Sequence, residues 1–335
     1  MARPRAAGSR AVLGQFLMLA LAWGSSFLFI KVGLEGLSPG QVVLGRMLAG
    51  AAALLVLTAV ARQRLPRDPV VWGHLAVVSV LLCVLPFSLF AWAELHVSSG
   101  LASIYNATTP LMTLLIASVA LPEERPNRSK LAGLVLGFTG VLVVLGPWSG
   151  FSGGEGPAQA ACLLATLSYG LAFVYIRRFI SPRGLPALPV ATVQVCLGAT
   201  ITLLLAPFTA TAPVHLSWPV VLSVAALGVA STGLAYLWNT DIVAAWGATN
   251  ASTVTYLTPV VGVTLGIAVL GEAISWNEPV GAMIVIAGIA LSQGRVPSRR
   301  RPGPPPRPAN VAAHSADQTQ PARPGRVNGT LERGR

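Results

Sequence analysis

Long apolar runs follow one another along most of this chain, and each is long enough to cross a lipid bilayer. The first covers residues 11–31, and only short polar stretches separate the runs that follow. A helix rises about 1.5 Å per residue, so about twenty residues cross a hydrocarbon core of roughly 30 Å. Because lipid offers the backbone no hydrogen-bond partner, such runs must be helical. The strands of a membrane barrel would instead alternate polar and apolar residues.

We therefore predict an all-α membrane protein with ten transmembrane helices. The predicted helices cover approximately residues 11–31, 41–61, 70–92, 98–120, 129–146, 157–178, 189–207, 217–238, 246–270 and 278–294. The composition agrees, since 53% of the residues are hydrophobic and only 10% are charged. A soluble domain carries about 25% charged residues. This chain has too few charges to cover a surface in water.

Lysine and arginine cluster in alternate loops between the apolar runs. Clusters precede the first run and follow the second, fourth, sixth and tenth, whereas the loops in between hold only Lys31. The clusters are Arg3, Arg5 and Arg10; Arg62, Arg64 and Arg67; Arg125, Arg128 and Lys130; Arg177, Arg178 and Arg183; and Arg295 with Arg299 to Arg301. Positive residues mark the cytoplasmic side, so we expect a multi-pass inner-membrane protein with both termini cytoplasmic. The loop near Asp241 breaks the series because it lacks a basic residue.

The last segment, residues 295–335, is rich in Arg, Pro and Gly and offers little apolar surface to bury. We predict a disordered cytoplasmic tail that is mainly solvated, with contact to anionic lipid as the alternative. Nine of the 23 Lys and Arg residues lie in this tail, and they contribute much of the net charge of +12. No basic stripe interleaved with aromatic residues is present, so nucleic acid is not an expected partner.

The chain contains an internal duplication. Superposing Pro110 on Pro259, 149 positions later, also aligns Thr109 with Thr258 and Glu123 with Glu272. The stretch AWGSSFLFIK around Trp23 and Gly24 similarly matches SYGLAFVYIR around Tyr169 and Gly170. Each half then holds five spans, and an odd number turns the second copy upside down in the membrane. Inverted halves are typical of secondary transporters, whose two halves can exchange conformations.

The residues that carry the repeat also resemble a known family. The stretch AWGSSFLFIKVGLEGLSPGQVVLGRMLAGA and the two matched Pro-to-Glu segments resemble EamA-domain proteins of the drug/metabolite transporter superfamily. The resemblance implies two tandem EamA repeats, residues 11–146 and 157–294, and ten helices with cytoplasmic termini. It also implies export or exchange of small polar or amphipathic metabolites, amino acids and their derivatives among them. The second half lacks a match for Arg46, where Gln194 is nearest.

Two charged residues inside predicted helices are candidates for the transport site. Arg46 lies within the second helix, where an unpaired charge is costly, so it needs a cavity or a partner. It could anchor an anion or a carboxylate, or it could reach the interface as a structural residue. Glu94, near the end of the third helix, could pair with Arg46 or carry a coupling proton, or could be an interfacial acid. Glu123 and Glu272 are predicted to be interfacial or structural.

Aromatic and amide residues within the spans could line a central pocket for amphipathic or cationic solutes. These candidates are Trp23, Trp92, Tyr105, Asn106, Tyr169, Trp238, Asn239, Asn250 and Tyr256. The alternative for tryptophans near span ends is the interfacial belt, which fits Trp72, Trp148 and Trp276. Pro110 and Pro259 should kink their helices, and such kinks either expose carbonyls to a cavity or shape its wall.

Motifs for other functions are not found. The sequence has no HExxH, no G-x-S-x-G and no phosphate-binding loop, so we expect neither an enzyme nor an ATP-driven pump, and no cofactor or metal. Two Gly-xxx-Gly motifs, at Gly133 and Gly262, permit close helix packing within one chain or between chains, and they fix no oligomeric state. The predicted function is exchange or efflux of a small-molecule substrate by alternating access. A membrane-embedded sensor or a lipid flippase on the same fold is the alternative.

Overall fold

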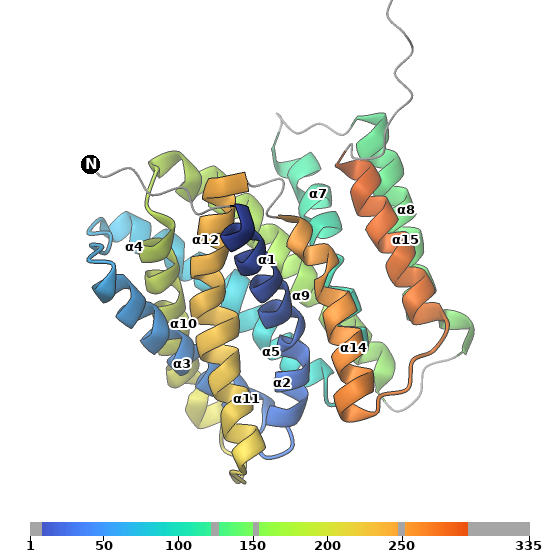
Figure 1. Cartoon of the computed structure of the whole chain (residues 1–335), viewed down its shortest axis with the longest axis horizontal. Helices are drawn as coiled ribbons and strands as arrows, with labels where there is room; N and C mark the ends of the chain where they lie inside the picture. Colours follow the sequence, from blue (N-terminus) through green and yellow to red (C-terminus); the bar gives the residue numbers. More distant parts are fainter. Residues whose placement is uncertain (1–8, 122–126, 150–153, 247–251, 294–335) are drawn as a thin grey trace, which may run out of the picture. The chain divides into compact units, whose positions relative to one another are not determined.

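The computed structural model describes residues 9–121, 127–149, 154–246 and 252–293, and its described residues form an all-helical bundle. The predicted tail from Arg295, Glu123 and the candidate Asn250 lie outside the described residues. Figure 1 shows the helices packed side by side with their axes roughly along one direction. In the first half, the helices are α1 (Ser9–Gly24), α2 (Ser26–Gly33), α3 (Pro39–Val60), α4 (Pro69–Ser79), η1 (Val80–Val84), α5 (Leu85–Ala93), α6 (Ser99–Asn106), α7 (Thr109–Ala120) and α8 (Arg128–Leu145).

The second half repeats this order. Its helices are α9 (Glu155–Tyr175), η4 (Ile176–Ile180), η5 (Ser181–Arg183), α10 (Ala187–Thr209), α11 (Trp218–Gly228), η6 (Val229–Leu234), α12 (Ala235–Trp246), η7 (Ser252–Tyr256), α14 (Thr258–Leu270) and α15 (Asn277–Ser292), and η3 (Pro147–Ser149) lies between the halves. Within the described ranges, eight continuous helical segments are long and apolar enough to cross a membrane. Two shorter apolar helices, Val254–Leu270 and Asn277–Ser292, occupy the remaining predicted runs. The all-helical class is therefore confirmed for the described residues, with eight candidate spans, and a count of ten spans stays a prediction.

The two halves share their helix irregularities. The π-helices η1 and η6 interrupt the third helix of each half at equivalent positions. Pro110 and Pro259 each occupy the second position of the helix that follows a break, α7 and α14. Proline is tolerated there because that N–H has no partner within the helix. The predicted kinks are therefore breaks of the helix, with a new helical segment beginning one residue before each proline.

The packing of the halves follows an exchange symmetry. Helix α3 packs against α10, which is its counterpart in the second half. The first span of each half packs against the third span of the other half, through the pairs α2 with α11 and α9 with α5. Ser168 of α9 donates to the Leu81 carbonyl within η1 (2.7 Å), while Ser231 of η6 donates to the Ala22 carbonyl of α1 (2.6 Å). Each π-helix is thus bound to the first helix of the opposite half.

Counterpart helices run in opposite directions. Helix α1 begins beside α12, where Gln15 donates to Asp241 (2.9 Å). Helix α2 ends beside Glu94, and α9 begins at the same end, where Gly154 lies against the His96 ring. We call the end of the bundle that holds Gln15 and Asp241 the Gln15 end, and the opposite end the Glu94 end. The first helix of one half ends where the first helix of the other begins.

Helices α8 and α15 pack closely through glycine. A Cβ on Gly288 would lie 2.5 Å from the Gly137 nitrogen, and one on Gly140 would lie 2.6 Å from the Val285 nitrogen. Only glycine allows two helix backbones to approach this closely. The predicted motif at Gly133 therefore serves packing within the chain, since Gly133 also faces the Gly288 carbonyl.

Candidate functional site

Arg46 is buried at the boundary between the two halves. A capping box formed by Ser38 and Gln41 begins α3, and it fixes the start of the helix that carries Arg46 inward. The Arg46 side chain is 7% exposed, and its Nε donates to Thr232 Oγ1 of η6 (3.2 Å). Its guanidinium lies 3.6 Å from the centre of the Phe87 ring, a favourable position for a cation over an aromatic face.

Gln194 makes the corresponding contacts from α10. Its Nε2 donates to the Tyr236 hydroxyl (3.2 Å) and to Cys83 Sγ (3.3 Å). Tyr236 lies 149 positions after Phe87, and Thr232 lies 149 positions after Cys83. Two corresponding triads therefore face each other: Arg46 with Phe87 and Thr232, and Gln194 with Tyr236 and Cys83. Only the first triad carries a positive charge.

The π-helices explain how these side chains reach one site. A π-helical turn adds a residue and frees local backbone groups. Cys83 lies within η1 and Thr232 within η6, where the Thr232 hydroxyl also donates to the Leu227 carbonyl (3.0 Å). Thr232 is thereby oriented with its oxygen available to Arg46. The Tyr236 hydroxyl joins the same group of side chains through Gln194, and Tyr169 lies near Arg46. The cluster so formed combines one guanidinium with aromatic and hydroxyl groups, and we call it the Arg46 site.

Glu94 is fully buried, and it does not pair with Arg46. No ion pair within 4.0 Å joins the two residues, and neither Glu94 carboxylate oxygen has a hydrogen-bond partner in the described chain. Lys31 Nζ contacts the Glu94 backbone carbonyl and the Val97 carbonyl (3.0 Å), so it holds the loop and leaves the Glu94 carboxylate unbonded. The predicted pairing of Glu94 with Arg46 is therefore wrong for this conformation, because Arg46 turns toward Thr232 and Phe87.

The predicted aromatic set divides between different parts of the bundle. Tyr169 stacks on Phe90 (6.3 Å between ring centres) near the Arg46 site. Tyr105 is fully buried and donates to Gln159 Oε1 (3.1 Å). Trp23 and Trp238 both pack against an apolar cluster of residues from α1, α12 and η7. These last two tryptophans therefore form part of a packed core at the Gln15 end.

The remaining candidates are Trp92, Asn106, Asn239 and Tyr256. Trp92 is 39% exposed and contacts the His96 ring (5.3 Å). Asn106 ends α6, where its carbonyl accepts from the Thr109 hydroxyl (2.7 Å), and Asn239 is half-buried in α12. Tyr256 donates to Gln293 Oε1 (2.9 Å).

Glu272 joins the two halves at the Glu94 end. Its carboxylate accepts from the Ser99 nitrogen (2.7 Å), the Ser99 hydroxyl (2.9 Å) and the Gly100 nitrogen (3.0 Å). These groups begin α6, and a carboxylate there satisfies N–H groups that the helix leaves unpaired. The approach needs Gly266, because a Cβ at that position would meet the Glu272 carboxylate. We call the contact of Glu272 with Ser99 and Gly100 the Glu272 latch.

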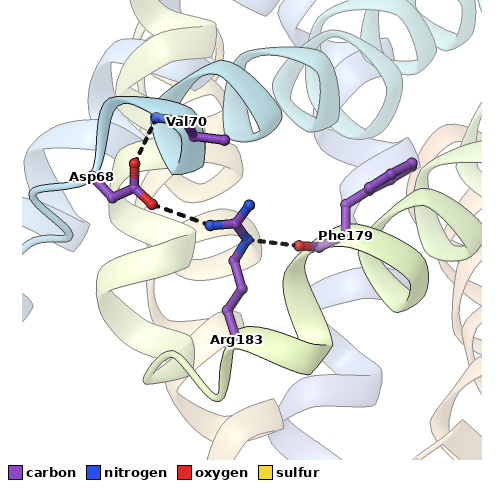
Figure 2. Close-up of polar contacts among 4 residues, drawn as sticks. All are labelled: Asp68, Val70, Phe179 and Arg183. Atoms are coloured by element: carbon purple, nitrogen blue, oxygen red, sulfur yellow. Dashed lines mark hydrogen bonds and ion pairs between the residues drawn. The ribbon is translucent and has the colours of Figure 1, made fainter.

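Polar contacts also cross between the halves at the Gln15 end. Figure 2 shows Arg183 donating to the Asp68 carboxylate (3.1 Å) and to the Phe179 carbonyl (3.0 Å). Asp68 caps α4 by accepting from the Val70 nitrogen (2.8 Å). Both charged side chains are partly exposed, so this ion pair is worth only about 0–1 kcal/mol. The Glu272 latch, by contrast, uses three hydrogen bonds to an anion.

Comparison with protein-family models gives one match, to the EamA-like transporter family, over residues 12–146 and 157–293. The matched segments leave only a short connection between them, at the boundary of the two halves described above. Together they cover most of the chain, and each contains one complete set of the repeated helices.

Several curated proteins are similar over nearly their whole length. The uncharacterized transporter YdfC of Bacillus subtilis is 26% identical over 85% of this chain and 91% of its own length. A probable terminal-alkyne amino-acid exporter of Streptantibioticus cattleyicolor is 27% identical, over 85% and 94%. A probable amino-acid metabolite efflux pump of Salmonella typhimurium is 24% identical, over 82% and 92%. A solved crystal structure matches with a TM-score of 0.61 at 21% identity, over 85% of this chain and 99% of the other.

Proposed function

Because this chain belongs to the EamA-like transporter family, we propose that it is a secondary transporter that exports or exchanges a small amino-acid-like or amphipathic metabolite by alternating access. The family and the named relatives support a membrane transporter for a small molecule. Two of those relatives are named for amino-acid cargo. The observation that carries our proposal is the buried Arg46, a positive charge that has no carboxylate partner among the described residues and lies at the boundary of two inverted halves.

The chemistry of the Arg46 site suits a carboxylate next to an apolar group. An arginine can donate two parallel hydrogen bonds to a carboxylate, and only its Nε is used in the contact with Thr232. Phe87 supplies an aromatic face beside it, and Tyr169 lies nearby. A solute that enters would exchange water for these groups, so an amino acid or a derivative with an apolar side chain fits the chemistry.

Alternating access needs contacts that form at one end while the other end opens. At the Glu94 end, the Glu272 latch binds α6, and α6 packs along α14. The loops there also meet, since Gln41 Nε2 donates to the carbonyls of Ala210 (3.2 Å) and Ala212 (2.6 Å). We propose that this closed end faces away from the cytoplasm, as the distribution of basic residues predicts. Breaking the Glu272 latch would then open the outer side.

Glu94 is our candidate for the coupling proton. Its carboxylate is buried without a hydrogen bond, and a charge in such a place is costly unless it is neutralised or paired. A proton bound in the closed state and released on opening would couple proton movement to transport.

The proposed function is tested in proteoliposomes that contain the purified protein. Vesicles loaded with a mixture of unlabelled amino acids should take up labelled leucine or phenylalanine by exchange, whereas protein-free vesicles should not. Fluorescent phospholipid in the same vesicles should keep its leaflet distribution. Movement of the lipid without movement of any amino acid would instead favour the flippase alternative.

A further inference from the structure

A pocket that does not include Arg46 lies at the Glu94 end. It has a volume of about 260 Å³ and is formed by the loop after α5, the end of α8, the start of α9 and the segment between α14 and α15. His96 is exposed, so the pocket reaches the protein surface. Its polar lining consists of His96, Ser98, Glu155, Gln159, Ser275, Asn277 and Glu278. We call it the Glu278 pocket.

Glu278 is the residue that requires a ligand. It belongs to the first turn of α15 and is only 9% exposed, and its Oε2 is buried without a hydrogen-bond partner in the described chain. A buried carboxylate oxygen loses its hydration and needs a donor in return. Glu278 lines the pocket, so a molecule in the pocket can supply that donor. Glu272 acts electrostatically on Glu278 and adds further negative potential.

The other polar groups of the pocket also favour a hydrogen-bond donor as ligand. Asn277 already uses its Nδ2 to donate to the carbonyls of Val143 (3.2 Å) and Val144 (3.0 Å), so its Oδ1 is the group left to bind a ligand. Glu155 adds a second carboxylate, and among the described residues no Lys or Arg lines the pocket. Lys31 lies at the same end of the bundle, where its Nζ donates to the carbonyls of Glu94 and Val97.

A metal ion fits this arrangement poorly. Among the described residues, no three His, Cys, Asp or Glu side chains come together closely enough to hold one. A protonated amine needs no such convergence, because its three N–H groups can be shared among spaced acceptors. We propose that the Glu278 pocket binds a small protonated primary amine, with the ammonium group at Glu278 and Asn277. The Glu278 pocket is independent of the transport function proposed for the Arg46 site.

Calorimetric titration of the detergent-solubilised full-length protein with n-butylammonium chloride tests the proposal. Saturable binding at one site is expected, with n-butanol at the same concentration giving none. Glu278→Gln keeps the size of the side chain and removes its charge, so it should weaken binding at least about tenfold. The matched control is Glu35→Gln, which changes an exposed carboxylate at the same end and should bind like the wild type.

Three results would overturn the proposal. The first is no saturable heat with the wild-type protein, and the second is equal affinity in Glu278→Gln. The third is displacement of the amine by equimolar KCl or MgCl₂, which would assign the site to an inorganic cation. If Glu278→Gln unfolds, Glu155→Gln takes its place and should weaken binding several-fold. Loss of amine binding would leave leucine exchange at the Arg46 site intact. The amine-binding proposal and the transport proposal can therefore fail separately.

Discussion

Arg46 and Gln194 occupy corresponding positions of the two halves and reach the same buried site from neighbouring helices. Arg46 contacts Thr232 and lies over Phe87, while Gln194 contacts Cys83 and Tyr236, the residues that correspond to those partners. The site is therefore symmetric in its geometry and asymmetric in its charge. A carboxylate would bind on the Arg46 side in both the inward-open and the outward-open forms.

Exchanging the two side chains should restore part of the activity that the single change removes. Arg46→Gln leaves no cation and should lower amino-acid exchange at least tenfold, since a charge-assisted hydrogen bond contributes about 1.5–3 kcal/mol. In the double variant Arg46→Gln with Gln194→Arg, the cation returns over the Tyr236 ring. We expect about a third or more of wild-type exchange, measured in proteoliposomes.

A double variant no more active than Arg46→Gln would show that the position of the charge matters as well as its presence. The matched control is Arg64→Gln, which removes an arginine from an exposed loop. It should exchange amino acids at the wild-type rate.

Glu272→Ala should open the Glu94 end. The change removes three hydrogen bonds from the start of α6, so the closed state loses about 2–5 kcal/mol. A cysteine introduced at Val263, which packs beside Gly100, should then react at least tenfold faster with a water-soluble maleimide in a cysteine-free background. An unchanged labelling rate would exclude the Glu272 latch as a gate, and Glu35→Ala should leave the rate unaltered.

Glu94→Gln should separate proton coupling from solute exchange. The amide cannot release a proton, so a pH gradient should no longer drive uphill accumulation of labelled amino acid. Exchange at equal pH should remain within about twofold of wild type, because Glu94 does not touch Arg46. Proteoliposomes with and without an imposed pH gradient provide both measurements. Uphill accumulation that survives the change would remove Glu94 from the coupling mechanism.

Gly288→Val should destabilise the bundle by forcing α15 away from α8. The new side chain would overlap the Gly137 nitrogen and the Gly133 carbonyl, and such overpacking costs about 1–3 kcal/mol. Gly14→Val is the matched control, since a Cβ there meets nothing within 4 Å. Thermal unfolding in detergent should show a fall of several degrees for the first variant only. Equal melting temperatures would show that the α8–α15 contact is looser than its backbone approach indicates.

The sequence predicted the helices and the duplication because both depend on the positions of apolar residues and prolines. The place of Arg46 within a helix was also predictable, whereas the sequence left open whether its side chain is buried or reaches the interface. The partners of Arg46 and Gln194 could not be predicted in the same way, because Phe87, Cys83 and Thr232 are ordinary residues for a membrane helix. Their signal was the offset of 149 positions, which pairs Cys83 with Thr232 and Phe87 with Tyr236.

Trp92 shows where a regular helical period fails. It was expected to line the pocket, yet it is 39% exposed. The π-helix η1 precedes it in the same span, and the extra residue of a π turn rotates all later side chains relative to the α-helical period. The sequence carries no clear mark of such a turn. The face on which a later residue lies therefore had to come from the structure.

The most direct test of our account compares the transport of an amino acid with that of its amide. Wild-type proteoliposomes should exchange labelled phenylalanine at least ten times faster than phenylalaninamide, which lacks the carboxylate, and Arg46→Gln should remove this preference. Equal rates for the two compounds in the wild type, or the same preference after Arg46→Gln, would contradict binding of the solute carboxylate at Arg46.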